Sequence, residues 1–226
     1  MFRQLLSIFK KDSLMSRSYQ RSFEMLDITN NMFLKAKQSL RHTEDNLKDI
    51  DIYNKDIEIN KYEREVRRNV LNHLILTEGE ELPSGLVLVS IIIDIERIGD
   101  YTKNIVELAM NHPEKLVGGE FEEDLQKVEN AVSDLFIQTK KCFENSDKEL
   151  GLQLIQEYKW VNRLCDEMVF KLVKTREKKI IPEEAVSLVL YFRWLKRINS
   201  HLRNIVTSVV NPFDRIGFKP KKKRMD

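Results

Sequence analysis

Carboxylate side chains recur at helical spacing on two stretches of this sequence, and carboxylates gathered in this way can hold a metal ion. Glu96 and Asp100 lie four residues apart in the segment DIERIGDYTKN. Asp56, Asn60 and Glu63 follow a similar spacing in DIEINKYE. Residues three, four and seven apart share one face of an α-helix, so each set forms an acidic stripe. If the two helices pack side by side, the stripes meet at the edge of their contact.

Four carboxylates held close together repel one another unless protons or cations neutralise them. Oxygen-rich clusters of this kind suit hard or borderline metals such as magnesium, manganese and iron. The alternative is that the acids are solvated side chains paired with neighbouring bases. Glu63 could then pair with Arg67, and Glu96 or Asp100 with Lys103. The spacing alone leaves both interpretations open.

Gly99 lies within the second acidic stretch. A glycine inside a helix costs about 1 kcal/mol relative to alanine, so its presence indicates a local requirement. We expect another helix or a ligand to approach closely beside Asp100. Arg97 points to a different face, and we expect it to pair with Asp94 or with a neighbouring helix.

The elements that must position these acids are six long helices. Apolar residues recur with helical period over six segments, at about 14–42, 48–77, 83–111, 120–145, 147–176 and 182–210. Pro83 and Pro182 suit the first turns of two of them, because proline lacks the N–H that a first turn does not use. The chain has only seven Gly and five Pro, too few turn residues for a many-stranded sheet. The sequence predicts an all-α fold.

The two halves of the sequence share one pattern. RIGDYTKNIV, residues 97–106, aligns with RINSHLRNIV, residues 197–206, and five of these ten positions are identical. VGGE, residues 117–120, holds the double glycine that best marks a division. We therefore predict a tandem pair of three-helix up-down bundles, with residues 1–116 as the first repeat and 117–226 as the second.

The motif segments carry a family resemblance. DIERIGDYTKNIVELA resembles the signature helix of the PhoU family of phosphate-uptake regulators, in which an E-x-x-x-D motif sits within ERIGDH..NIAE. DIEINKYEREVRR, residues 56–68, is similar to the family's D-x-x-I-N-x-x-E segment. The resemblance covers about residues 14–211, and a two-fold repeat of three helices is the family's architecture. It implies metal ligands at Glu96, Asp100, Asp56, Asn60 and Glu63.

The resemblance also implies a function. Members of that family are cytoplasmic, often dimeric proteins without enzymatic activity, which act between a phosphate transporter subunit and a sensor histidine kinase. Some of them carry iron or other metals on the acidic motifs. We therefore expect no catalytic residues, a homodimer, a transporter subunit and/or a kinase as partner, and a divalent or trivalent metal (Fe, Mn, Mg or Zn). The alternative is a helical bundle that uses the same carboxylates for metal storage or hydrolysis.

The second half does not keep these acids. Its counterparts of Glu96, Asp100, Asp56 and Glu63 are Lys196, Ser200, Tyr158 and Cys165, in that order, while Asn162 matches Asn60. We therefore expect a metal at the first repeat only. His201, beside Ser200, lacks acidic partners in the sequence, and we expect it to be packed or solvated rather than a metal ligand.

The composition narrows the class of protein. A formal net charge of +2 indicates no nucleic-acid partner, and 33% charged with 42% hydrophobic residues is typical of a globular chain. The two cysteines, Cys142 and Cys165, are too few for a disulfide framework, and we interpret them as small buried hydrophobes. There is no glycine-rich phosphate loop, Ser/His/Asp arrangement or cysteine-rich zinc spacing, which argues against an enzyme. No apolar run reaches the ~18–20 residues of a membrane span, so we expect a cytoplasmic protein.

Both ends of the chain are basic. KPKKKRMD, residues 219–226, is interpreted as a solvated tail. FRQLLSIFKK, residues 2–11, is interpreted as an amphipathic segment that caps the bundle or mediates dimerisation. The alternative for both is a peripheral contact with an anionic membrane surface, and for the tail also a contact with an acidic partner.

Overall fold

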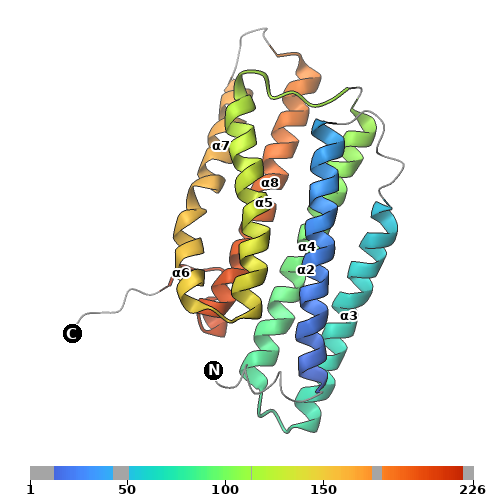
Figure 1. The fold of residues 1–226 in the computed structure, drawn as a ribbon, viewed down its shortest axis with the longest axis vertical. Coiled ribbons are helices and arrows are strands. Elements are labelled where there is room, and N and C mark those ends of the chain that lie inside the picture. The colour runs from blue at the N-terminus through green and yellow to red at the C-terminus, as the bar shows by residue number, and fades with distance from the viewer. Residues whose placement is uncertain (1–12, 43–50, 113, 175–179, 221–226) are drawn as a thin grey trace, which may run out of the picture.

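The computed structural model describes residues 13–42, 51–112, 114–174 and 180–220, and all the regular structure in these ranges is helical (Figure 1). The first half contains α2 (Leu14–Arg41), α3 (Ile52–Leu76) and α4 (Leu82–Asn111). The second half contains α5 (Glu122–Glu144), α6 (Lys148–Glu157), α7 (Lys159–Lys174) and α8 (Pro182–Val210), with short 3-10 turns at Gly119–Phe121 and Phe213–Arg215. The all-α prediction is confirmed. The N-terminal segment and the end of the basic tail, residues 1–12 and 221–226, lie outside the described residues, so their interpretation stays a prediction.

Local sequence accounts for several helix starts. The Ser13 hydroxyl accepts a hydrogen bond from the Ser16 N–H at 3.1 Å at the start of α2. The Asp147 carboxylate accepts from two first-turn N–H groups of α6, at 3.1 and 3.0 Å. Such N-caps satisfy backbone donors that have no partner inside the helix. Pro83 and Pro182 lie in the first turns of α4 and α8, as the sequence predicts.

The predicted helix over 147–176 is divided at Tyr158 into α6 and α7. In a continuous helix the Ile155 carbonyl would accept from the N–H four residues later. Here it accepts from the Arg203 guanidinium on α8, with 3.1 Å between the carbonyl oxygen and Nη2. The interruption therefore coincides with a side chain from another helix taking a backbone acceptor.

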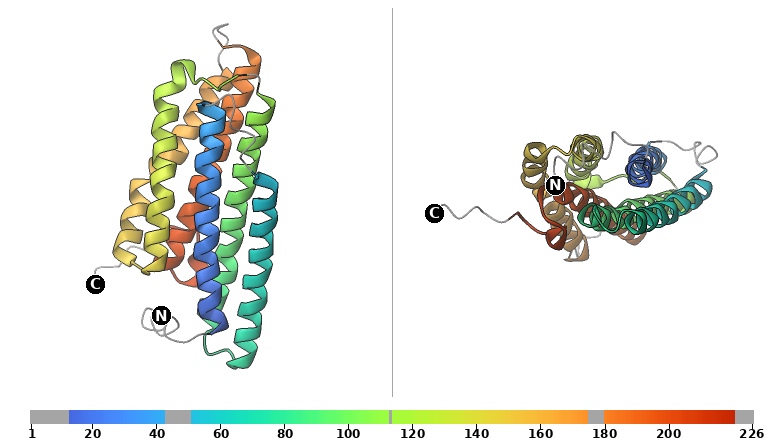
Figure 2. Two further views of the ribbon diagram at one scale, coloured as in Figure 1. Left: turned by 45° about the vertical axis from the view of Figure 1, so that its right-hand side comes forward. Right: turned by 90° about the horizontal axis from the view of Figure 1, so that it is seen from below.

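The helices form two adjoining bundles of three, with α6 and α7 together acting as one arm. α3 packs on α2 and α4, while α6 and α7 pack on α8. α4 lies against α8 and α2 against α5, so α3 and the α6–α7 arm occupy opposite outer edges (Figures 1 and 2). The predicted tandem pair of three-helix bundles is confirmed. The boundary between residues 116 and 117 stays a prediction.

One apolar core runs through both bundles. Phe33 of α2 stacks on Phe136 of α5 with 5.3 Å between ring centroids, and Phe23 meets Phe143 edge-on at 5.2 Å. Cys142 and Cys165 are buried free thiols, as predicted, and burial raises the pKa of each to about 12. None of the described helices is long and apolar enough to cross a membrane.

A buried ion pair also joins the bundles. The Arg41 side chain at the end of α2 is 3% exposed and its Nε donates to Glu129 Oε1 of α5 at 3.1 Å. Arg41 also donates to Glu122 and to the Leu116 carbonyl. The Tyr191 hydroxyl of α8 donates to the same Glu129 oxygen at 2.7 Å. Burial raises the pKa of Glu129, while Arg41 and Tyr191 act to lower it, so the pair stabilises a carboxylate that the core alone would disfavour.

A second polar junction connects α4 to α8. Asp94 Oδ1 lies 2.6 Å from His201 Nδ1 and accepts from Asn204 Nδ2 at 3.0 Å. The His201 ring stacks on Tyr101 with 5.7 Å between centroids. His201 is therefore packed, one of its two expected states, but contrary to expectation it has an acidic partner, Asp94 of α4. The expected pairing of Arg97 with Asp94 does not occur among the described contacts, because the Asp94 carboxylate faces α8 while Arg97 is exposed.

Another helix approaches Gly99 closely. A Cβ at this position would lie 3.0 Å from Ile59 Cδ1 of α3 and 3.7 Å from Thr29 Cγ2 of α2. The structure shows one of the two expected causes, the close packing of another helix. The glycine thus lets α3 lie against α4 beside the acidic stripes.

Replacing Gly99 with Val should destabilise the protein by about 1–3 kcal/mol, because the added methyl groups overpack this contact. Urea unfolding of Gly99→Val and wild type measures the difference. Adding Ile59→Ala to the variant should recover part of the loss. Equal stability of Gly99→Val and wild type would contradict the packing explanation.

Candidate metal centre between α3 and α4

The predicted ligands lie on two helices that pack together. α3 carries Asp56, Asn60 and Glu63, and α4 carries Glu96 and Asp100. Because Ile59 of α3 packs beneath Gly99 of α4, the two acidic stripes lie along one seam. We call these five residues the acidic seam.

Lys103 lies between the two stripes. Its Nζ is 3.0 Å from Asp56 Oδ2 on α3 and 3.4 Å from Asp100 Oδ1 on α4. The pairing with Asp100 was one of the interpretations of the sequence. The pairing with Asp56 was not, since these residues are far apart in the chain and only the packing of the two helices brings them together. The lysine thus neutralises part of the negative charge of the seam.

The remaining acids have weaker or local partners. Glu63 pairs with Arg67 one turn later, at 2.8 Å, as the solvated-acid interpretation predicts. Asn60 Nδ2 lies 3.5 Å from Asp56 Oδ2. Among the three acids of the seam that form ion pairs, Asp100 is the most exposed, with 45% of its side-chain area accessible.

Glu96 shows that the acids influence one another. Its pKa is raised to about 7, first by burial and then by the charges of Asp100 and Glu63. Arg97 lowers it, and Asp56 raises it by less than Arg97 lowers it. A carboxyl with this pKa is partly protonated near neutral pH, so a proton partly relieves the repulsion in the seam. A cation could replace that proton.

The oxygen donors of the acidic seam fit a hard or borderline metal. In the structure, however, Asp56 and Asp100 are paired with the Lys103 ammonium rather than grouped around a metal position. Within the described part of the chain, no three Asp, Glu, His or Cys side chains are already grouped to hold a metal ion. The seam would offer carboxylate oxygens from Asp56, Glu63, Glu96 and Asp100, with the Asn60 carbonyl oxygen beside them. A bound metal would supply the positive charge that Lys103 and the Glu96 proton supply without it.

Replacing Glu96 with Gln should change how stability depends on pH in the metal-free chain. The folded pKa of about 7 exceeds the usual value of 4.5, so Glu96 makes the wild type less stable as pH rises from about 4.5 through 7. Near pH 8 the variant should be more stable by about 1 kcal/mol, a figure reduced for solvent screening of a partly exposed group.

Urea unfolding across that pH range, with a chelator present, measures this effect. Glu167→Gln, which changes an exposed acid paired one turn away with Arg163, is the control and should leave the pH profile unchanged. A wild-type profile that coincides with that of Glu96→Gln would show that Glu96 does not titrate in this way.

The corresponding seam of the second repeat has a different chemistry. Asn162 donates to Ser200 at 2.8 Å and accepts from Asn199 at 2.9 Å. Lys196 lies 2.6 Å from Asp166, and Tyr158 donates to Asp134. A hydrogen-bonded amide–hydroxyl network thus stands where the first repeat gathers carboxylates.

Residues 23–109 match the family model of the PhoU domain. This chain carries a PhoU domain. The matched range contains the whole acidic seam and ends within the last turn of α4. No curated protein matches the chain in sequence.

Two solved structures extend the likeness to both repeats. PhoU from Pseudomonas aeruginosa is 20% identical, with a TM-score of 0.76 over 87% of this chain and 95% of that one. The phosphate transport system regulatory protein PhoU from Streptococcus pneumoniae is 15% identical, with a TM-score of 0.73 over 86% of this chain and 92% of that one. At these identities the likeness establishes the fold. The PhoU-like arrangement therefore includes the second repeat, which lacks the acids.

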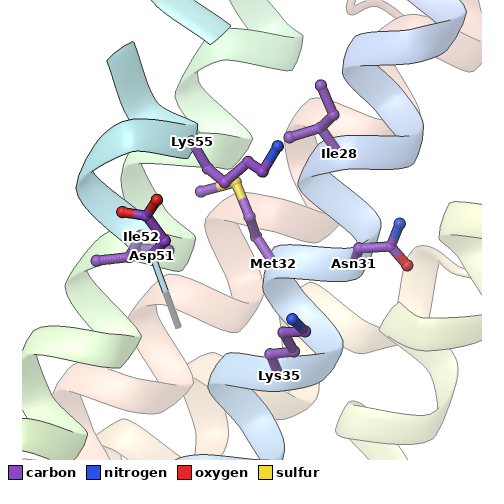
Figure 3. A pocket seen from close by; sticks show the side chains of 7 residues that line it. All are labelled: Ile28, Asn31, Met32, Lys35, Asp51, Ile52 and Lys55. Carbon is purple, nitrogen blue, oxygen red and sulfur yellow. The ribbon is translucent and has the colours of Figure 1, made fainter. Parts of the chain in front are cut away.

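A separate cavity lies between α2 and the start of α3 (Figure 3). It has a volume of about 180 Å³, and Lys55 extends across it from α3 toward Ile28 and Met32 of α2. We assign this cavity no role in the candidate metal centre.

Proposed function

We propose that this protein is a cytoplasmic regulator of phosphate uptake that acts through protein contacts rather than catalysis. Its partners in this proposal are a phosphate transporter subunit and/or a sensor histidine kinase. The observation that carries the proposal is the PhoU domain over residues 23–109, which includes the signature segments of both acidic helices. The Streptococcus pneumoniae relative is a phosphate transport system regulatory protein, and the shared fold supports the same class of function here.

The proposal includes one metal ion at the acidic seam. Glu96, Asp100, Asp56 and Glu63 would bind iron or another divalent or trivalent cation, and Lys103 would move aside. The pKa of Glu96 supports this, because burial and then the charges of neighbouring acids raise it, and a bound cation would compensate for both. The second repeat would bind no metal, since its counterparts are Lys196, Ser200, Tyr158 and Cys165.

The outer face of α3 is proposed as a contact surface, either with the partner or within a homodimer. Ile57, Leu71 and Ile75 are exposed there, at 62%, 59% and 67% of their accessible areas. Their spacing places them on one side of the helix. Leu71 and Ile75 are one turn apart, and neighbouring exposed apolar side chains commonly mark a protein–protein contact.

Capture of partners from the native host tests the proposal. The tagged full-length protein should recover a phosphate transporter subunit or a sensor kinase from cells grown in excess phosphate. Leu71→Glu/Ile75→Glu should lose the partner or the homodimer, whereas Asn130→Glu, a change at an exposed position of α5, should retain both. Recovery of neither partner class by the wild type would refute the regulatory proposal.

A further inference from the structure

The two repeats hold their corresponding cations in different ways. The alignment of residues 97–106 with 197–206 places Arg203 at the position of Lys103. Lys103 lies between Asp56 and Asp100. The counterparts of those two acids are Tyr158 and Ser200, so Arg203 has lost both carboxylate partners. The repeat therefore keeps the cation but not the anions that balance it.

Some N–H donors of the Arg203 guanidinium have no hydrogen-bond partner among the described residues. A guanidinium carries five N–H donors, and Nη2 gives one hydrogen bond, to the Ile155 carbonyl at the end of α6. Its Nε is buried and has no hydrogen-bond partner within the described residues. No carboxylate in the described part of the chain forms an ion pair with Arg203, and burial lowers its pKa. A partly buried charge without a counter-ion is costly, so the site favours an anion from solution.

A cavity of about 170 Å³ lies beside this arginine, between the α6–α7 arm, α8 and the segment that follows α8. Its polar lining includes Asn162, Ser200, Arg203, Asn204, Thr207 and Lys219. One ordered water requires about 10–15 Å³ by the same kind of measure, so the cavity has room for a small polyatomic ion. Two of its lining residues are cations, and none is an acid.

Two acids on neighbouring elements are already paired. Asp94 of α4 lies 2.6 Å from His201 and accepts from Asn204. Asp166 of α7 lies 2.6 Å from Lys196 and 3.4 Å from Arg193. Because these carboxylates are engaged by other side chains, the positive charge at the cavity is left for a ligand.

We propose that this second-repeat cavity binds a small tetrahedral oxyanion through Arg203, with Lys219 as a second cation. The planar guanidinium fork suits two oxygens of one oxyanion, and Lys219 adds an ammonium at the exposed rim. The two repeats then have opposite ligand preferences, a cation at the acidic seam and an anion at the Arg203 cavity. The inference rests on side chains of the second repeat and does not depend on the proposed regulatory function.

Calorimetric titration of inorganic phosphate into the full-length protein, in chloride buffer of constant ionic strength, tests the proposal. Phosphate should bind the wild type, and Arg203→Gln should weaken binding by about 10- to 100-fold, as expected for loss of charged hydrogen bonds. Lys219→Gln should weaken it several-fold. Arg193→Gln, a cation on the same helix that already pairs with Asp166, should bind phosphate as the wild type does.

Titration with sulfate in place of phosphate shows whether the site selects phosphate among tetrahedral oxyanions. Equal binding of both anions supports a general oxyanion site, and binding of phosphate alone supports a phosphate-selective one. Circular dichroism checks the fold of Arg203→Gln. If that variant does not fold, Lys219→Gln carries the test, because Lys219 is exposed. The proposal is overturned if neither anion binds the wild type, or if the informative variant binds phosphate with wild-type affinity.

Discussion

Replacing Arg41 with Met is expected to lower the free energy of unfolding by about 3–5 kcal/mol, the cost of leaving one member of a buried ion pair alone. Arg41 and Glu129 have only 3% and 5% of their side-chain areas exposed. Without the guanidinium, the Glu129 carboxylate would keep only the Tyr191 hydroxyl among these partners. Urea unfolding of the variant and wild type measures the loss.

The loss should also depend on pH. Burial already raises the pKa of Glu129 in the wild type, and removing Arg41 raises it further. A raised carboxyl pKa costs stability as pH rises through the folded pKa, so the variant should lose more stability near pH 8 than near pH 5. A loss that is the same at both values would contradict this explanation.

Two further variants distinguish the contribution of the buried ion pair to stability from the general effect of replacing an arginine. Arg41→Met/Glu129→Leu should recover much of the stability, because the uncompensated charge is then gone. Arg21→Met removes a more exposed arginine that pairs with Glu65 at 3.3 Å, and should cost at most about 1 kcal/mol. Similar losses in Arg21→Met and Arg41→Met would show that burial of the pair is not decisive.

Replacing Asp94 with Ala is expected to cost about 2–3 kcal/mol, because one carboxylate oxygen serves both His201 and Asn204 of α8. The His201 side chain is 9% exposed, so water cannot readily replace the lost acceptor. Chemical unfolding measures the change. His201→Ala/Asp94→Ala should cost less than the sum of the two single variants, because both remove the same contact.

A matched change on the same helix provides the control for Asp94. Arg97→Ala, one turn away and exposed, should change the free energy of unfolding by less than about 0.5 kcal/mol. Equal effects of Asp94→Ala and Arg97→Ala would mean that the α4–α8 junction contributes little to stability.

The fold was largely predictable because its information is local. Helical periodicity, the prolines at 83 and 182 and the repeated RI…NIV segments gave the helices and their duplication. The division at Tyr158 was not predictable, since it coincides with a hydrogen bond from Arg203, a residue far along the chain. The same holds for Arg41 with Glu129 and for Asp94 with His201, because each pair forms only when separate helices pack.

The sequence predicted which acids form the candidate metal centre, but not which cations pair with them. Spacing along each helix placed the acids on shared faces, and Gly99 indicated the close approach of another helix. The sequence did not indicate that Lys103 would contact Asp56 as well as Asp100. It also did not indicate that Arg203, in the matching position, would lie beside a cavity without an acid.

Elemental analysis of the protein purified without chelators is the decisive test of a metal centre in the first repeat. We predict one equivalent of metal per chain, lost in Glu96→Gln/Asp100→Asn and retained in Lys196→Gln, which alters the matching position of the second repeat. Lys103→Gln should bind metal more tightly than the wild type, because the competing ammonium is gone. Absence of metal from the wild type, two equivalents per chain, or one equivalent that persists in Glu96→Gln/Asp100→Asn would contradict a single metal centre at the acidic seam.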